Sequence, residues 1–266
     1  MASTANHYET HSAETYEEAY FYEPGAYMSH LVDLVTQRMA FDDNEPRHML
    51  DIGGGTGNFA RALVENNNLR VTVIEPFLEE ANNDKSDKVA FVKAPAEIFL
   101  SSHRDAWRKQ PFHQILIKET IHHIDEKLRV DILKGIYNEL QSFENYSTTP
   151  SILIVTRPQI EIDYPLWDAA RQVWKENQPS LEQLISELES AGFVDIKYTV
   201  EKYGSSIPLD RWKRMVKNRF WSTFADFSDD ELESGCELLA KERPPDEDGI
   251  IHFEDRLLFI TGRKIS

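Results

Sequence analysis

Hydrophobic positions along the chain predict short buried strands that alternate with helices. Five apolar runs have the length and continuity of strands that are buried on both faces, at 48–52, 71–74, 88–92, 112–117 and 151–156. Between them, apolar residues recur at helical spacing, most clearly where every fourth position from Leu128 to Leu140 is apolar. This alternation predicts an α/β fold in which helices cover both faces of a mostly parallel sheet.

The beginning of the chain departs from this alternation. Tyrosines and glutamates crowd residues 7–27, and the Pro24-Gly25 pair separates most of this segment from the next helix. That helix is expected over 27–40, because its apolar residues recur at three- and four-residue spacing. We therefore expect residues 1–40 to form an N-terminal helical extension that acts as a lid.

The last third of the chain mixes further helices with longer strand-like segments. Helical patterns occupy 180–190, 208–221 and 228–242, and strand-like patterns occupy 193–203 and 250–262. Because two of these helices lie between the last two strand-like segments, we expect a helical insertion at about 205–243. The insertion would belong to one α/β domain that spans residues 41–266.

Composition narrows the partners and the compartment. The 266 residues include 29 Lys and Arg against 46 Asp and Glu, so the formal net charge is −17. Such a surface repels phosphate backbones, which argues against a nucleic-acid partner. Cys236 is the single cysteine, which fits a reducing compartment. The polar start of the sequence resembles neither a signal peptide nor a transit peptide. No apolar run approaches the ~20 residues that a membrane span requires. We expect a cytoplasmic protein without a membrane partner, and the oligomeric state stays open.

A glycine-rich loop comes directly after the first predicted strand. The segment DIGGGTGNF, from Asp51 to Phe59, opens a helix expected at 58–66. Glycines let the backbone turn sharply and approach a ligand, and a helix N-terminus offers free N–H groups. Glu75 lies 18 residues after Gly57, at the end of the second strand, where a carboxylate can accept hydrogen bonds from a ribose. This order of elements predicts a nucleotide-containing cofactor, and the run Gly55-x-Gly57-x-x-Ala60 fits NAD.

The longer run Asp51-x-Gly53-x-Gly55-x-Gly57 resembles the first motif of the class I S-adenosylmethionine-dependent methyltransferases. The resemblance extends more loosely over about 45–265. The segment 115–123, ILIKETIHH, is similar to the one after the fourth strand in the small-molecule branch of that family. The resemblance implies a Rossmann-like, doubly wound sheet of seven strands, mostly parallel with an antiparallel last strand, and S-adenosyl-L-methionine as the cofactor.

The resemblance also implies a set of cofactor contacts. These are Asp51, Gly53, Gly54, Gly55, Gly57, Glu75, Pro76, Ala96, Glu97 and Lys118. The acid that ends the first strand and the glycine loop would hold the methionine part, and Glu75 would bind the ribose hydroxyls. The adenine-binding acid that the family commonly carries after the third strand has no clear counterpart, so Glu97 or the backbone of Ala96 is expected to replace it.

Three alternatives stay open. Tyr198 and Lys202 have the Tyr-x-x-x-Lys spacing of short-chain oxidoreductases, which use NAD(P). They fall in a strand-like segment, however, where residues four apart lie roughly 13 Å from each other and cannot act together. A protein or RNA methyltransferase is the second alternative, although the net charge disfavours RNA and the Asn/Asp-Pro-Pro-Tyr/Phe signature is missing after the fourth strand. The third is a catalytically inactive protein that binds the cofactor.

Candidate catalytic and acceptor-binding residues come after the fourth and fifth strands. His122 and His123 are expected at the carboxyl edge of the sheet, where ligands bind in open α/β folds. A neutral imidazole there can take a proton from a hydroxyl or an amine, whereas a thioether or tertiary amine requires no base. Arg157 suits a two-point contact with a carboxylate of the acceptor, and pairing with a structural acid is the alternative.

The other residues expected on the substrate side are aromatic. Tyr16, Tyr20 and Tyr27 are candidates to close over the site, because aromatic faces stabilise cations such as a sulfonium. Trp167 either lines the same pocket or belongs to the core of a helix. His7 and His11 have the four-residue spacing of a helical metal pair, but no third ligand lies nearby, so no metal is expected. The resemblance implies direct in-line methyl transfer to a small molecule, and Arg157 indicates that this acceptor bears a carboxylate.

Overall fold

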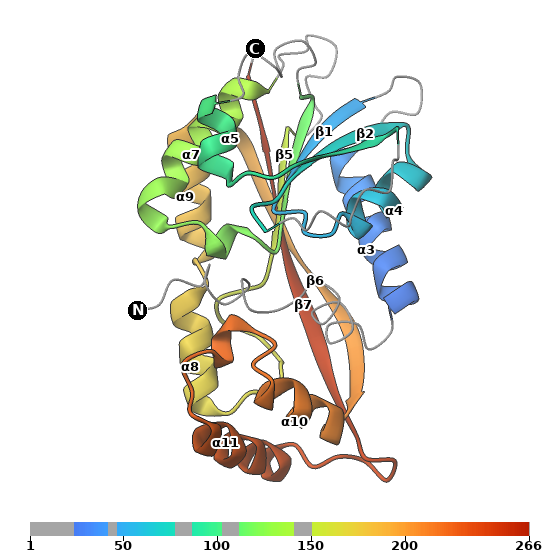
Figure 1. The fold of residues 1–266 in the computed structure, drawn as a ribbon, viewed down its shortest axis with the longest axis vertical. Coiled ribbons are helices and arrows are strands. Elements are labelled where there is room, and N and C mark those ends of the chain that lie inside the picture. The colour runs from blue at the N-terminus through green and yellow to red at the C-terminus, as the bar shows by residue number, and fades with distance from the viewer. Residues whose placement is uncertain (1–23, 42–46, 78–86, 103–111, 141–150, 266) are drawn as a thin grey trace. The chain divides into compact units, whose positions relative to one another are not determined.

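The apolar runs of the sequence form strands that all join one sheet (Figure 1). The computed structural model describes residues 24–41, 47–77, 87–102, 112–140 and 151–265. Within these residues the strands are β1 (Arg47–Ile52), β2 (Leu69–Ile74), β3 (Val89–Val92), β4 (Gln114–Lys118), β5 (Ile152–Thr156), β6 (Val194–Pro208) and β7 (Ile250–Arg263). The predicted α/β class and seven-stranded sheet are confirmed.

The order of the strands places β1 in the interior of a doubly wound sheet. The sheet runs β3-β2-β1-β4-β5-β7-β6, and β1 pairs in parallel with β2 on one side and with β4 on the other. Strand β7 pairs antiparallel with β5, with Ile260 opposite Ile154. The sheet is therefore mostly parallel with an antiparallel last strand, as predicted, and the carboxyl ends of β1, β2 and β4 meet at one edge.

Helices form where apolar residues recur at helical spacing. They are α3 (Pro24–Met39), α4 (Asn58–Asn66), α5 (Ala96–Ser102), α7 (Glu126–Glu139), α8 (Asp168–Asn177), α9 (Leu181–Ala191), α10 (Leu209–Lys217) and α11 (Asp229–Glu242), with short 3₁₀ turns η1 (Ile121–His123) and η3 (Ser222–Phe224). Helix α11 begins at a capping box, in which Ser228 and Glu231 each accept the other's backbone N–H. None of the helices in the described part of the chain has both the length and the apolar character to cross a membrane.

The described residues divide into two units. The sheet unit takes its described residues from 24–156, 182–199 and 258–265, and the helical unit takes them from 157–181 and 200–257. Strands β6 and β7 contribute residues to both units. The expected boundaries of the N-terminal extension, the domain and the insertion stay predictions.

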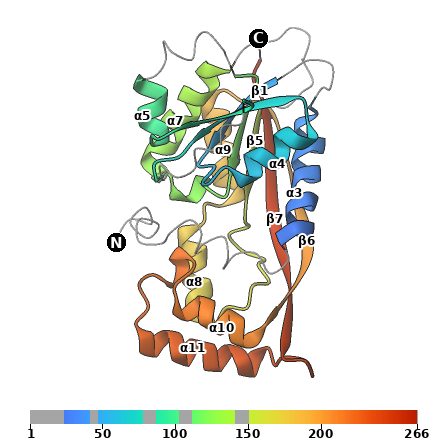
Figure 2. The ribbon, with the colours of Figure 1, turned by 45° about the vertical axis from the view of Figure 1, so that its right-hand side comes forward.

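In the sheet unit, helices cover both faces of the sheet. Helices α3 and α4 lie on one face, and α5, α7 and α9 lie on the other, as both ribbon views show (Figures 1 and 2). The central strands are accordingly apolar on both faces, and every residue of β5 is buried. The apolar side chains between the sheet and the helices form the core of this unit.

The helical unit has a core of its own that is rich in aromatic residues. Trp212 of α10 is fully buried and donates its indole N–H to the carbonyl of Pro165 at 2.9 Å. Phe220, Trp221 and Phe253 have ring centroids within 5.7 Å of the Trp212 ring. These contacts explain why α10 keeps one apolar face although its other positions are mostly charged.

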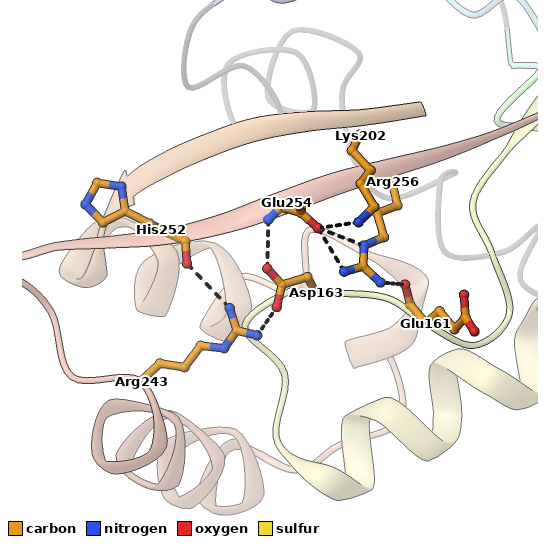
Figure 3. Close-up of polar contacts among 7 residues, drawn as sticks. All are labelled: Glu161, Asp163, Lys202, Arg243, His252, Glu254 and Arg256. Carbon is orange, nitrogen blue, oxygen red and sulfur yellow. Dashed lines mark hydrogen bonds and ion pairs between the residues drawn. The ribbon is translucent and has the colours of Figure 1, made fainter. Parts of the chain in front are cut away.

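A network of charged residues holds the loop before α8 against β7 (Figure 3). Asp163 accepts the backbone N–H of Glu254 at 2.8 Å and pairs with Arg243. Arg256 pairs with Glu254 at 2.8 Å and donates to the carbonyl of Glu161 at 2.5 Å. Because several charges share these contacts, the loop is fixed more firmly than one exposed ion pair could fix it.

A buried ion pair connects two helices of the sheet unit. Arg129 of α7 lies 2.9 Å from Glu187 of α9, and their side chains are 5% and 7% exposed. Burial raises the pKa of Glu187 above its usual value, although the charge of Arg129 lowers it. The desolvation of this pair therefore offsets much of its attraction.

We expect the two members of this pair to be far more costly to separate than to replace together. Glu187→Leu alone leaves the Arg129 charge buried and should lower the free energy of unfolding by about 3–5 kcal/mol in a urea titration. Arg129→Met combined with Glu187→Leu should be close to the wild type or more stable. As a control, Asp131→Ala removes the exposed partner of Lys134 and should leave the unfolding midpoint nearly unchanged. A double variant as unstable as the single one would contradict this account.

Candidate active site

Asp51 is a buried carboxyl group near the carboxyl end of β1, an interior strand of the sheet. It is 1% exposed, and neither of its carboxylate oxygens has a hydrogen-bond partner among the described residues. Its neighbours in the sheet are Val73 of β2 and Leu116 of β4. Burial raises the pKa of Asp51 from 3.8 to about 7, against the opposing charge of Lys118 and with a smaller contribution from the charge of Glu75. A cation placed beside Asp51 would therefore be strongly stabilised.

The glycine loop, residues 53–57, has left-handed backbone at three positions. Gly53, Gly55 and Gly57 have φ angles of 72°, 57° and 78°, a region that residues with a Cβ rarely adopt. A Cβ on Gly54 would lie 2.5 Å from a carboxylate oxygen of Asp51, whereas a Cβ on Gly55 would meet no atom of the described chain within 4 Å. The loop thus packs closely around Asp51 and leaves open space at Gly55.

Glu75 connects the end of β2 to this loop. One of its carboxylate oxygens accepts the N–H of Gly55 at 3.1 Å, and the other accepts the N–H of Phe77 at 3.1 Å. Burial raises the pKa of Glu75, and these two N–H groups lower it in part. The carboxylate is thus held next to the open position of the loop.

Lys118 and the two histidines lie at the end of β4 and just beyond it. The Lys118 ammonium group lies 5.3 Å from the centroid of the Phe59 ring. His122 and His123 form the turn η1 with Ile121, and their rings are 3.9 Å apart between centroids. Nδ1 of His122 is buried and has no hydrogen-bond partner within the described part of the chain. Burial, with help from His123 and Arg129, holds the pKa of His122 well below its usual 6.5, so this imidazole is neutral.

The structure brings together only part of the predicted set of residues. Asp51, Glu75, Lys118 and the glycine loop interact directly or through their charges. Ala96 and Glu97 begin α5, where the side chain of Glu97 is exposed, and Pro76 comes directly after Glu75. Tyr27 is buried in α3, and Tyr16 and Tyr20 lie outside the described residues.

Arg157 and Trp167 belong to the helical unit. Nε of Arg157 donates to the Tyr164 hydroxyl at 2.5 Å and lies 3.5 Å from the carboxylate of Asp255. The hydroxyl of Tyr164 in turn donates to Asp255. Trp167 is 6% exposed and stacks on Phe224, with ring centroids 5.8 Å apart. The contacts of Arg157 and Trp167 with substrate stay predictions.

Sequence reasoning missed three residues that shape the glycine loop. Phe91 of β3 lies where a Cβ on Gly57 would be, so only glycine fits there. Arg61 of α4 donates to the carbonyl of Thr56 at 3.0 Å, and its guanidinium lies 5.4 Å from the Phe91 ring centroid. Thr120, just beyond β4, lies against Gly53. Their positions relative to the loop carried no local signal, because each contact depends on the folded sheet.

No grouping of three or more His, Cys, Asp or Glu side chains suitable for a metal occurs within the residues that the structure describes. The ends of β1, β2 and β4 instead provide the buried carboxylate of Asp51, the half-buried carboxylate of Glu75, open backbone at Gly55 and the neutral imidazole of His122. Such a set suits an organic ligand with a cationic group and hydroxyls.

Comparisons with known proteins address the family and the fold. A family model described as a methyltransferase domain matches residues 25–198. No curated protein sequence matches the chain. Among solved structures, phosphoethanolamine N-methyltransferase 2 of Haemonchus contortus, in complex with S-adenosyl-L-methionine, is similar with a TM-score of 0.59 at 17% identity. That match covers all of this chain, which spans 61% of the length of the Haemonchus protein.

Two further solved structures have the same fold. A cyclopropane synthase from Mycobacterium tuberculosis matches at 14% identity with a TM-score of 0.51, covering 88% of this chain and 84% of that one. A SAM-dependent methyltransferase from Archaeoglobus fulgidus matches at 15% identity with a TM-score of 0.50, covering 89% of this chain and 94% of that one. At these identities the likeness extends to the fold alone.

We expect the pH dependence of the unfolding free energy of the ligand-free protein to reflect the raised pKa of Asp51. Because its folded pKa is above its unfolded one, the native state binds more protons between about pH 4 and 7, and Asp51 lowers stability as pH rises through that range. The loss is at most about 4 kcal/mol for a shift of this size. The side chain of Asp51→Asn cannot titrate, so the variant lacks this loss of stability. The unfolding free energy of the variant minus that of the wild type should therefore increase as pH rises from 4 to 8.

The measurement is a series of urea titrations of both proteins at matched pH values. Other groups, such as His122 with its lowered pKa, cancel in the difference between the two proteins. Asp131→Asn, at an exposed position on α7, serves as the control and should show no comparable trend. A pH-independent difference between Asp51→Asn and the wild type would mean that Asp51 ionises normally.

Proposed function

Because the chain belongs to the class I S-adenosylmethionine-dependent methyltransferases, we propose that it transfers a methyl group from this cofactor to a small-molecule acceptor. The family's cofactor is S-adenosyl-L-methionine, and similar proteins have been solved with it or with its demethylated product. One of them was solved with phosphomonomethylethanolamine, a small molecule. The side chains at the sheet edge, more than the whole-chain likeness, support the assignment of individual residues.

The observation that carries the proposal is the buried Asp51 carboxylate, which packs against Gly54 in the same loop that leaves open space at Gly55. A buried carboxylate whose two oxygens accept no hydrogen bond from the described residues suits the ammonium group of a methionine moiety. Space at Gly55 and the adjacent carboxylate of Glu75 suit a ribose with two hydroxyls. The residues therefore fit the cofactor, and we assign the other predicted contacts, Pro76, Ala96, Glu97 and Lys118, to the same ligand.

The proposed reaction depends on what the cofactor supplies and on what the residues of the protein contribute. When bound, the cofactor supplies a methyl group that a sulfonium makes electrophilic. Asp51 and Glu75 would fix its orientation, and an acceptor atom would attack in line, so that much of the rate comes from positioning. His122 and His123 would orient an acceptor hydroxyl or amine and accept its proton where one is released.

We further propose that the acceptor bears a carboxylate and that Arg157 binds it. The contacts of Nε with Tyr164 and Asp255 hold the plane of the guanidinium, and a planar guanidinium in a fixed orientation suits a carboxylate. Tyr16, Tyr20, Tyr27 and Trp167 complete the proposed substrate side. Action on protein, on RNA or through NAD(P), and binding without turnover, remain the outcomes that experiments must distinguish.

We expect S-adenosylhomocysteine to bind the wild type at micromolar strength or better in calorimetry, about −8 kcal/mol, whereas NAD should not bind. Its affinity should rise between pH 6 and 7.5, by up to about tenfold per pH unit, because the ammonium group requires ionised Asp51. Asp51→Asn should bind weakly without this pH dependence. Tight binding of NAD in place of S-adenosylhomocysteine would exclude the proposed function.

Glu75→Ala should weaken S-adenosylhomocysteine by about 1.5–3 kcal/mol, the range of a hydrogen bond to a charged group. Glu65→Ala removes an exposed carboxylate from α4 and is the matched control, for which the affinity should not change. Equal binding by Glu75→Ala and the wild type would place the ribose elsewhere.

The carboxylate proposal is tested by pairing candidate acceptors with their methyl esters in an assay of S-adenosylhomocysteine release. For a carboxylate acceptor, Arg157→Lys should lower kcat/KM at least tenfold, a loss of about 1.4 kcal/mol. For the matching ester, the same substitution should change kcat/KM much less. Equal losses for acid and ester would show that Arg157 stabilises the helical unit and does not bind the carboxylate.

A further inference from the structure

Thr120 makes hydrogen bonds with both parts of the candidate site. It lies between β4 and the histidine turn η1, and its hydroxyl lies 3.2 Å from the carbonyl of Gly53 and 3.0 Å from that of Lys118. Its own carbonyl accepts the N–H of His123 at 2.8 Å. One residue therefore connects the first glycine of the loop to the second histidine of the turn.

The side chain of Thr120 also packs directly on the loop. A Cβ on Gly53 would overlap Cγ2 and Oγ1 of Thr120, so these atoms touch the backbone of Gly53. On its other side, Gly53 donates its N–H to the carbonyl of Ile74 in β2 at 2.8 Å. Gly53 is thus held between the end of β2 and the turn after β4.

We propose that Thr120 is a positioning residue that fixes the glycine loop to the histidine turn. The inference rests on the proposed function, in which the loop binds the cofactor and the histidines face the acceptor. Thr120 acts through Gly53 and His123, and it needs no contact with the reacting atoms. Binding of a ligand to the loop then affects the histidine turn as well, because Thr120 is bonded to both.

Two substitutions separate the contribution of the Thr120 hydroxyl from that of its methyl group, and a third substitution, at another residue, is the control. Thr120→Val keeps the shape and removes the hydroxyl, and Thr120→Ser keeps the hydroxyl and removes the methyl group. The control is Thr72→Val in β2, which removes a buried hydroxyl that lies 2.9 Å from Nε2 of His48. The partner of this hydroxyl, His48, belongs to neither the glycine loop nor the histidine turn.

The ligand-free protein gives the first readout. Thr120→Val removes the hydroxyl bond to the Gly53 carbonyl, whereas the Gly53 and His123 amides keep their own bonds to the backbone carbonyls of Ile74 and residue 120. If the hydroxyl bond fixes the loop to the turn, its loss should ease local opening of both, so hydrogen exchange at these two amides should be about three- to tenfold faster. Thr120→Ser should remain close to the wild type. Thr72→Val should leave both amides unchanged even if it lowers the melting temperature. Unchanged exchange at both amides in Thr120→Val would overturn the proposal.

S-adenosylhomocysteine gives the second readout. Its Kd should rise about three- to tenfold in Thr120→Val and recover in Thr120→Ser. Its addition should shift the side-chain nitrogen NMR signals of His122 and His123 in the wild type and in Thr120→Ser, and shift them less in Thr120→Val. Equal affinities and equal shifts in all variants would assign Thr120 a role in folding only. If the wild type does not bind this ligand, the proposed function fails, whereas the exchange measurement still decides whether Thr120 couples loop and turn.

Discussion

Burial of the Asp51 carboxylate at the end of β1 is the constraint on which the candidate site depends. An ionised carboxylate among apolar strands is costly, and the charge of Lys118 offsets only part of that cost. The ligand-free protein therefore holds an unfavourable group at the centre of its sheet edge. A ligand that brings a cation to Asp51 removes this cost on binding. The free energy by which the buried carboxylate destabilises the free protein therefore contributes to the affinity for that ligand.

The glycines around Asp51 serve different purposes. Gly53, Gly54 and Gly57 lack a Cβ because Thr120, Asp51 and Phe91 occupy the space that it would take. Of these four glycines in the described loop, Gly55 alone faces open space. Three of the positions thus serve packing within the protein, which gives the loop one shape, and the remaining one leaves room for a ligand. Phosphate or ribose binding loops need both properties, because a loop that rearranges on binding loses affinity to ordering.

The fold could be predicted because its signals are local. Continuous apolar runs and helical spacing each occupy a few residues, and they placed all seven strands of the described sheet. Strand β6 continues to Pro208, five residues beyond the predicted end at 203, because pairing in the sheet sustains a segment whose own pattern stops at Gly204. In the site, the order of the glycine loop and Glu75 along the chain could be predicted. The contact of Thr120 with Gly53 could not, because these residues are 67 positions apart in the sequence. The same holds for Tyr164 and Asp255, which are 91 positions apart. Contacts of that range depend on the folded chain.

The neutral state of His122 limits the chemistry that it can perform. Its pKa is lowered by burial, by His123 and by Arg129, and Arg129 is itself held by Glu187 in the helix layer. The ion pair between α7 and α9 therefore contributes to the charge state of the histidine turn. An imidazole with so low a pKa is a weak base, unsuited to removing a proton before bond formation. A hydroxyl becomes strongly acidic as its oxygen gains a methyl group, so a weak base can still accept the proton at that point. His122 is thus better suited to orient an acceptor and receive a late proton than to activate a nucleophile beforehand.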